Sequence, residues 1–258
     1  MTSKNTRTRY REFITEVLGS ASRIARDSFG KVSGVTKAED SNQVLTETDL
    51  AISHLLIERI REVFPYHNII DEEAGAIDNK SEYTWVIDPI DCTSNFAQGI
   101  PLYGVMIGLL EGDRPIVGGV ALPAFSEICV AEKGKGAWCN NVRLSVTNET
   151  DLLSALVAYG IDGHQKDPDF TRTECRLLAE IILNVRNLRS SNSVFDTVMV
   201  ARGRYGGVLN RSSKIWDNVA QEVLIEEAGG IYTDFFGKRI DYSDPLSKIG
   251  ENYTFCAA

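Results

Sequence analysis

Carboxylate side chains occur at three points where predicted strands or helices begin or end. The apolar run Trp85-Val-Ile predicts a buried strand that leads into Asp88 and Asp91. Asp71-Glu72-Glu73 follows a second short apolar run, and Trp216-Asp217 opens a predicted helix. Strand ends and a helix start can bring such side chains together, and Mg²⁺ prefers oxygen ligands of this kind. The pattern predicts a cage for two or three divalent cations, whereas three unrelated turn and helix caps are the alternative.

Composition excludes several classes of protein. The chain has 258 residues, of which 43% are hydrophobic, so it is neither disordered nor fibrous. Lys and Arg number 27 and Asp and Glu number 36, a formal charge of −9 that makes nucleic acid an unexpected partner. Apolar stretches such as 103–110 are too short to cross a bilayer. We therefore expect a cytoplasmic protein with no membrane partner.

Five scattered cysteines show no zinc spacing and no Cys-x-x-Cys motif. We interpret them as reduced thiols. Cys129 and Cys139 are expected on neighbouring strands, as buried thiols rather than as a bridge.

Hydrophobic periodicity predicts the elements that must position the carboxylates. We expect helices over 9–29, 48–64, 169–185, 193–202 and 216–228. We expect strands over 69–70, 84–87, 103–110, 116–122, 127–131 and 153–159. The first half, 1–148, is interpreted as an α+β metal-binding half, and 149–258 as an α/β half on the substrate side. The two would share one active-site seam.

Several motifs in a fixed order resemble the inositol monophosphatase family, part of a magnesium-dependent, lithium-sensitive sugar-phosphatase superfamily. The motifs are Thr46-Glu-Thr-Asp49, Asp71-Glu-Glu73, Asp88-Pro-Ile-Asp91-x-Thr93-x-Asn-Phe96, Lys133-Gly-Lys-Gly-Ala137 and Trp216-Asp217 with Glu227-Ala-Gly-Gly230. The resemblance spans nearly the whole chain. It implies a layered αβαβα sandwich, commonly a homodimer, that hydrolyses a small-molecule phosphate ester.

The resemblance also implies the roles of particular residues. The implied metal ligands are Glu72, Asp88, the carbonyl of Ile90, Asp91 and Asp217, with Glu73 nearby. Asp49, Thr93 and Glu72 are the implied catalytic residues, Thr93 contacting the attacking water and Asp49 orienting Thr93. Backbone N–H groups of Cys92 and Thr93 would face a phosphate oxygen at a helix start.

The chain departs from the family pattern at two places. Cys92 stands where the family usually has Gly, so a left-handed backbone there would be strained. We consider the Cys92 thiol either an inert neighbour or a group with a lowered pKa. On the substrate side, Asn210 stands where inositol-specific members have Glu, and Ser190-Ser-Asn-Ser193 replaces the usual Gly-Ser/Thr-Ala-Ala.

Lys37 belongs to a polar loop over 30–42. In relatives this region is a mobile flap that helps to complete a third metal position. The spacing from Lys37 to Asp49 differs from the usual family pattern.

The residues predicted to contact the substrate lie in or next to these motifs. They are Asp91, Cys92, Thr93, Ser191, Asn192, Asn210, Arg211 and Asp217. Arg211 and Lys214 together predict a basic side of the substrate site, which would suit a substrate with a second anionic or polar group. The alternative is that both are solvated surface charges. We expect a magnesium-dependent phosphomonoesterase acting on a small polyol or sugar phosphate. The alternatives are fructose-1,6-bisphosphatase, histidinol-phosphatase or nucleotide 3′-phosphatase activity, or a weakly active binding or regulatory protein.

Overall fold

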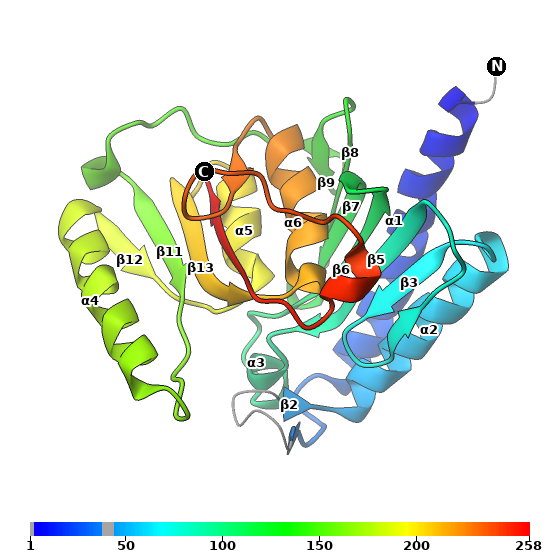
Figure 1. Cartoon of the computed structure of the whole chain (residues 1–258), viewed down its shortest axis with the longest axis horizontal. Coiled ribbons are helices and arrows are strands. Elements are labelled where there is room, and N and C mark those ends of the chain that lie inside the picture. Colours follow the sequence, from blue (N-terminus) through cyan, green and yellow to red (C-terminus); the bar gives the residue numbers. More distant parts are fainter. Residues whose placement is uncertain (1–2, 38–43) are drawn as a thin grey trace.

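Layers of helices and sheets alternate through the molecule (Figure 1). The computed structural model describes residues 3–37 and 44–258, with side chains from residue 10 onward; part of the predicted polar loop therefore lies outside the described residues. Helices α1 (Ser3–Ser28) and α2 (Glu47–Val63) form one outer layer. An eight-stranded sheet, a helical layer, a five-stranded sheet and a last helix follow in turn. The predicted αβαβα sandwich is confirmed.

The eight-stranded sheet is antiparallel except where β3 and β5 run parallel. Its strands, in spatial order, are β10 (Val142–Arg143), β9 (Ala137–Cys139), β8 (Glu127–Glu132), β7 (Arg114–Leu122), β6 (Gly104–Glu111), β5 (Tyr83–Asp91), β3 (Asn68–Asp71) and β4 (Gly75–Ile77). One face of this sheet is covered by α1 and α2, whose apolar stripes supply Leu18 and Leu56 to a fully buried core. A separate short ribbon pairs β1 (Val35–Thr36) with β2 (Val44–Leu45).

The five-stranded sheet is mixed, with β11 parallel to both of its neighbours and β15 antiparallel to its own. In spatial order its strands are β12 (Asn187–Arg189), β11 (Leu156–Gly160), β13 (Gly207–Ser213), β15 (Tyr253–Ala257) and β14 (Tyr232–Thr233). Helices α5 (Val194–Ala201) and α6 (Ile215–Glu227) lie between the two sheets, and α4 (Pro168–Asn184) lies outside the second (Figure 1). Short 3₁₀ turns occupy Pro123–Phe125, Leu152–Ser154 and Pro245–Lys248.

Glycines allow α6 to lie directly on the large sheet. A methyl group at Gly118 would stand 2.5 Å from the carbonyl oxygen of Ala220 in α6. At Gly108 it would stand 2.7 Å from a methyl group of Val219. The close approach buries α6 and fixes where its N-terminal end lies.

The predicted elements are confirmed with small shifts of their ends. Helix α1 begins at Ser3 instead of residue 9. Strand β5 was expected to end at Ile87 but continues to Asp91, because β6 pairs with it as far as that residue. The pairing shifts register between Asp88 and Asp91. Both aspartates are therefore held by the sheet instead of following it in a turn. The division of the chain at 148 and 149 stays a prediction.

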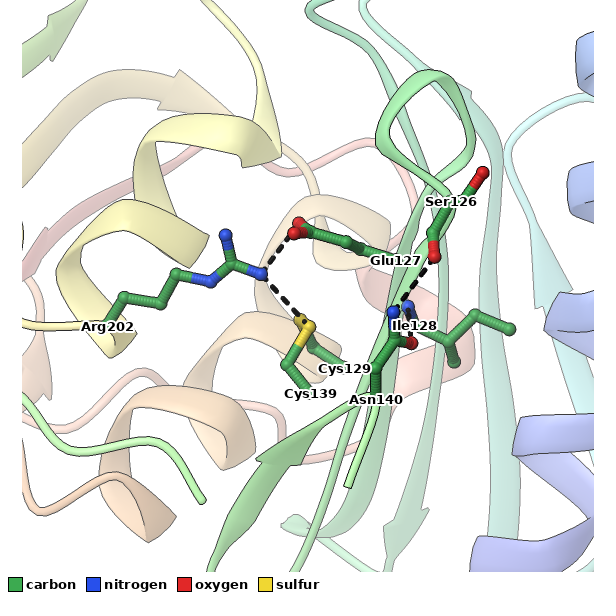
Figure 2. The surroundings of a disulfide bond; sticks show 7 residues. All are labelled: Ser126, Glu127, Ile128, Cys129, Cys139, Asn140 and Arg202. Atoms are coloured by element: carbon green, nitrogen blue, oxygen red, sulfur yellow. Dashed lines mark hydrogen bonds and ion pairs between the residues drawn. A yellow bond between two sulfur atoms is a disulfide. The ribbon is translucent and has the colours of Figure 1, made fainter. Parts of the chain in front are cut away.

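The structure corrects the expectation of reduced thiols at Cys129 and Cys139. These residues face each other across β8 and β9 and form a disulfide (Figure 2). Beside it, Nη2 of Arg202 lies 2.6 Å from Oε2 of Glu127 and 3.2 Å from Sγ of Cys139. Arg202 caps the C-terminus of α5, so these contacts connect α5 to the eight-stranded sheet. Cys92, Cys175 and Cys256 are free.

Within the described residues, no helix is both long enough and apolar enough to cross a membrane.

Candidate active site

A cavity of about 670 Å³ lies between the end of β5 and the elements of the second half of the chain. Its lining includes Glu72, Asp88, Asp91 and Asp217. Oxygens of Asp88, Asp91 and Asp217 lie within 4.8 Å of one another, although β5 and α6 are far apart in sequence. The three predicted acidic motifs therefore do meet at one place.

Burial of these acids raises their pKa values. It raises the pKa of Asp91 and of Asp217 to about 7 and that of Glu72 to about 8. For Asp88, burial and then repulsion by neighbouring carboxylates raise the pKa well above its usual range. Closely spaced buried carboxylates are costly when ionised without a cation.

Hydrogen bonds to the backbone hold two of the acids in place. The N–H of Val194, at the start of α5, donates to Oδ2 of Asp91 at 2.6 Å. The N–H of Lys214 donates to Oδ2 of Asp217 at 2.5 Å, as expected for an acid in the first turn of a helix. Asp88 differs, because its buried Oδ1 has no hydrogen-bond partner among the described residues. An unpaired buried oxygen between carboxylates fits a cation ligand.

Glu72 and Glu73 extend from a tight turn after β3. Oδ1 of Asp71 accepts hydrogen bonds from the N–H groups of Glu73 and Ala74, which shape the turn. The ammonium of Lys37 lies 3.1 Å from Glu72 and 2.7 Å from Glu73. This side of the cluster therefore already binds a positive charge supplied by the chain.

Thr93 connects the cluster to Asp49. Its Oγ1 lies 2.9 Å from Oδ1 of Asp49 and 2.9 Å from the carbonyl oxygen of Ile90. Asp49 is fixed at the start of α2 by a capping box with Thr46. Burial raises the pKa of Asp49, and the hydrogen bonds from Thr46 and Thr93 oppose that change.

Cys92 adopts the left-handed backbone conformation, with φ 61° and ψ 55°, directly before the short helix α3 (Thr93–Ala97). The sequence left open whether this position has a positive φ, and in the structure it does. The thiol points to the carbonyl oxygen of Ser191 at 3.9 Å. Burial, followed by the negative charge of Asp91, raises the pKa of Cys92 to about 12, opposite to the lowered value considered from the sequence.

The second half of the chain contributes Ser191, Asn192 and Asn210 to the cavity wall. The Asn192 amide is engaged with the backbone, since it accepts from the N–H of Ile161 at 2.9 Å and donates to its carbonyl at 2.8 Å. The carbonyl of Ser191 accepts from Nδ2 of Asn95. The bond between Ser191 and Asn95 joins the two halves of the chain at the cavity.

The side chain of Arg211 does not form the basic side of the cavity that the sequence predicted. Asn210 lines the cavity, whereas the next side chain along β13 lies on the opposite face of the sheet. The guanidinium carbon of Arg211 is 3.9 Å from the ring centroid of Phe170 in α4. Lys214 does reach the cavity lining, and its ammonium donates to the carbonyl of Gly250 at 2.8 Å.

Sequence reasoning missed two acids and a histidine that line the cavity, namely Asp162, Asp196 and His164. Ser193 caps α5, so an acid three residues later was a recognisable helix-start signal. Asp162 and His164 follow β11 in a polar loop, where no local pattern distinguishes them.

Comparisons with known proteins agree with this geometry. The family model for the inositol monophosphatase family matches residues 7–255. A fructose-1,6-bisphosphatase/inositol-1-monophosphatase from Aquifex aeolicus is 32% identical over 87% of this chain and 84% of its own length. A Nus factor SuhB from Pasteurella multocida is 35% identical over 78% of this chain and 76% of its own. The solved structure of an IMPase from Thermotoga maritima superposes with a TM-score of 0.83 at 27% identity, covering 96% of this chain and 91% of that one.

The family that these comparisons name is a family of phosphatases. The chain belongs to the inositol monophosphatase family.

Proposed function

We propose that this protein hydrolyses the phosphate monoester of a small polyol or sugar with the help of Mg²⁺. The observation that carries the proposal is the meeting of Asp88, Asp91 and Asp217 around a cavity. We assign Asp88, Asp91 and Asp217 as metal ligands, together with Glu72 and the carbonyl of Ile90. The donors are all oxygen, and the unpaired Oδ1 of Asp88 fits a hard divalent cation. When bound, Mg²⁺ would neutralise phosphate charge and lower the pKa of water.

Thr93 and Asp49 are proposed to orient the attacking water. An ionised carboxylate only accepts hydrogen bonds, so Asp49 draws the Thr93 hydroxyl proton toward Oδ1, 2.9 Å away. The lone pairs of Thr93 Oγ1 then remain to accept a hydrogen bond from water. The backbone N–H groups of Cys92 and Thr93 are proposed to contact a phosphate oxygen, because the first N–H groups of a helix have no partner within it.

The relatives support a phosphomonoester as the substrate, since one is named a fructose-1,6-bisphosphatase/inositol-1-monophosphatase. Asn210 is the proposed point of substrate selection, because it lines the cavity where inositol-specific members have Glu. Asn210→Glu should raise the rate with inositol 1-phosphate relative to fructose 1,6-bisphosphate. An unchanged ratio would refute this role.

A second candidate is a binding or regulatory role beside catalysis. It is favoured by the relative named Nus factor SuhB, which matches this chain at 35% identity. The partly buried acidic cluster favours catalysis, because clustered carboxylates without cations are costly to remove from water. Recovery of the same partners from the wild type and from Asp91→Asn, with or without Mg²⁺, would support the second role.

The test of catalysis is phosphate release from a panel of esters. The panel is inositol 1-phosphate, fructose 1,6-bisphosphate, adenosine 3′,5′-bisphosphate and histidinol phosphate, each with Mg²⁺, with chelator, and with Mg²⁺ plus Li⁺. We expect chelator to abolish turnover and Asp91→Asn to lower it by about a hundredfold or more. Asp169→Asn, on the exposed outer helix α4, is the matched control. Wild-type turnover by folded Asp91→Asn would exclude the ligand assignment.

A further inference from the structure

Two carboxylates line the cavity in addition to the four in the cluster. Asp162 follows β11, and Asp196 lies in the first turn of α5. Asp196 is only 2% exposed. Its Oδ2 accepts a hydrogen bond from the N–H of Ser191 at 3.1 Å, and the Ser191 side chain also stabilises this carboxylate. Its Oδ1 is buried and has no partner in hydrogen-bond geometry among the described residues. A buried, unpaired carboxylate oxygen at a cavity wall calls for a donor from a ligand.

The two acids lie close to the proposed reaction centre. Both line the same cavity as Asp91. Asp196 also lies in the first turn of α5, where the N–H of Val194 donates to Oδ2 of Asp91 at 2.6 Å. Oδ1 of Asp162 accepts a hydrogen bond from Nδ2 of Asn192 at 2.9 Å, so the 190–193 loop holds it beside the cavity. They are therefore placed to meet the alcohol part of an ester whose phosphate is at the cluster.

Few positively charged side chains of the described residues lie near Asp162 and Asp196. The guanidinium of Arg211 lies over Phe170, on the other face of β13 from Asn210, and the ammonium of Lys214 is bonded to the carbonyl of Gly250. The carboxylates of Asp162 and Asp196 thus face the cavity with one lysine among the charged lining residues described. A second phosphate on the substrate would be repelled here, whereas a protonated amine would be attracted.

We propose that the preferred substrate is the phosphate monoester of an alcohol that carries a protonated amine, which donates a hydrogen bond to Oδ1 of Asp196, with Asp162 adding electrostatic attraction. This proposal rests on the phosphatase function proposed above and names its substrate class. The proposed substrate therefore carries an amine in place of the second anionic or polar group that the sequence suggested. A hydrogen bond between an ammonium and a carboxylate is stronger than one between neutral groups, so the amine should be distinguished from a hydroxyl of similar size.

The test uses pairs of esters that differ only in one ammonium or hydroxyl group. One pair is 2-aminoethyl phosphate and 2-hydroxyethyl phosphate, and the other is glucosamine 6-phosphate and glucose 6-phosphate. We expect the wild type to show a kcat/KM about tenfold or more higher for the ammonium ester in at least one pair. Asp196→Asn keeps an acceptor for the N–H of Ser191 but removes the charge, so it should bring that ratio toward one. Asp162→Asn should lower it less.

Asp169→Asn should retain the wild-type ratio, because its carboxylate lies on the exposed outer helix. p-Nitrophenyl phosphate, which carries no amine, separates the two proposals. Its magnesium-dependent hydrolysis, together with a wild-type ratio near or below one in both pairs, would overturn the amine proposal and leave the phosphatase function standing. Lack of hydrolysis of every ester would overturn both proposals. A preference that survives unchanged in Asp196→Asn would exclude Asp196 as its source.

Discussion

Cys92 directly follows the proposed metal ligand Asp91, at a position where the resemblance leads us to expect Gly. It has the left-handed backbone conformation that favours glycine, and it still presents its backbone N–H at the start of α3. The half-buried thiol donates to the carbonyl of Ser191, so it contributes a contact between the two halves of the chain. The side chain is tolerated because it is small and unbranched at Cβ, which limits the cost of positive φ.

The effect of replacing Cys92 on the free energy of unfolding should therefore depend on whether the new side chain is branched at Cβ. Cys92→Gly relieves the strained backbone but loses the thiol contact, so the free energy of unfolding should change by no more than about 1 kcal/mol. Cys92→Val places a β-branched side chain at positive φ and should lower it by about 2 kcal/mol or more. Urea unfolding measures both, with Cys175→Val on exposed α4 as control. Equal stability of the Gly and Val variants would contradict this account.

Helix α6 has a direct influence on the site because Asp217 belongs to its first turn. The helix is positioned by its contact with glycines of β6 and β7 and, at its other end, by Glu227, whose carboxylate accepts from the N–H groups of Gly134 and Gly136 at 2.8 and 2.7 Å. Lys133 adds an ion pair with Glu226. The Lys-Gly-Lys-Gly and Glu-Ala-Gly-Gly motifs therefore meet each other, far from the cluster that they help to position.

Gly118→Ala tests whether the close contact between β7 and α6 positions α6. The added methyl group would clash with the Ala220 backbone, so α6 must move and the protein should lose about 1–3 kcal/mol of stability. We expect kcat to fall more than KM rises, because displacement of Asp217 disturbs the reaction centre. Steady-state kinetics with thermal unfolding measure both effects. Gly19→Ala, whose methyl group would make an ordinary 3.8 Å contact in α1, should be neutral or slightly stabilising. Normal kinetics for Gly118→Ala would show that α6 is not held by this contact.

The disulfide should stabilise the β8–β9 hairpin. It closes a separation of 10 residues, for which restriction of the unfolded chain gives about 3 kcal/mol. Urea unfolding of the wild type with and without a thiol reductant measures this contribution. The double variant Cys129→Ala, Cys139→Ala should be insensitive to reductant. Equal wild-type stability in both conditions would mean that the bridge contributes nothing.

At the scale of the whole molecule, the carboxylate cluster should make the stability of the fold depend on pH and on divalent cations. The folded-state pKa values of Asp91, Asp217 and Glu72 are raised to about 7, 7 and 8 by burial. A raised carboxyl pKa means that the folded protein binds more protons than the unfolded chain between the two values. Stability must then fall as pH rises through that range.

Metal-free protein should therefore be more stable near pH 5 than near pH 8. Mg²⁺ should raise the midpoint of thermal unfolding, and most strongly at pH 8, because it replaces the missing protons as the neutralising charge. Thermal unfolding with chelator and with Mg²⁺ at both pH values measures this. Asp91→Asn should reduce both the pH dependence and the magnesium effect. A metal-free midpoint that rises from pH 5 to pH 8 would contradict the assigned direction.

The amino-acid pattern was sufficient for the long helices, for the central strands of the first half and for the acidic cluster, but it did not predict the strands at 207–213 and 253–257. Helix periodicity, strand ends and the order of Glu72, Asp88, Asp91 and Asp217 are properties of short segments, and the resemblance fixed how those segments meet. The opposite wall was predicted poorly because it depends on contacts between distant segments. The strand pleat places Arg211 against α4, while the packing of α5 turns Asp196 into the cavity. The pairing of β8 with β9 likewise brings Cys129 and Cys139 together. Side-chain direction and disulfide pairing follow from register and packing, which only the folded chain defines.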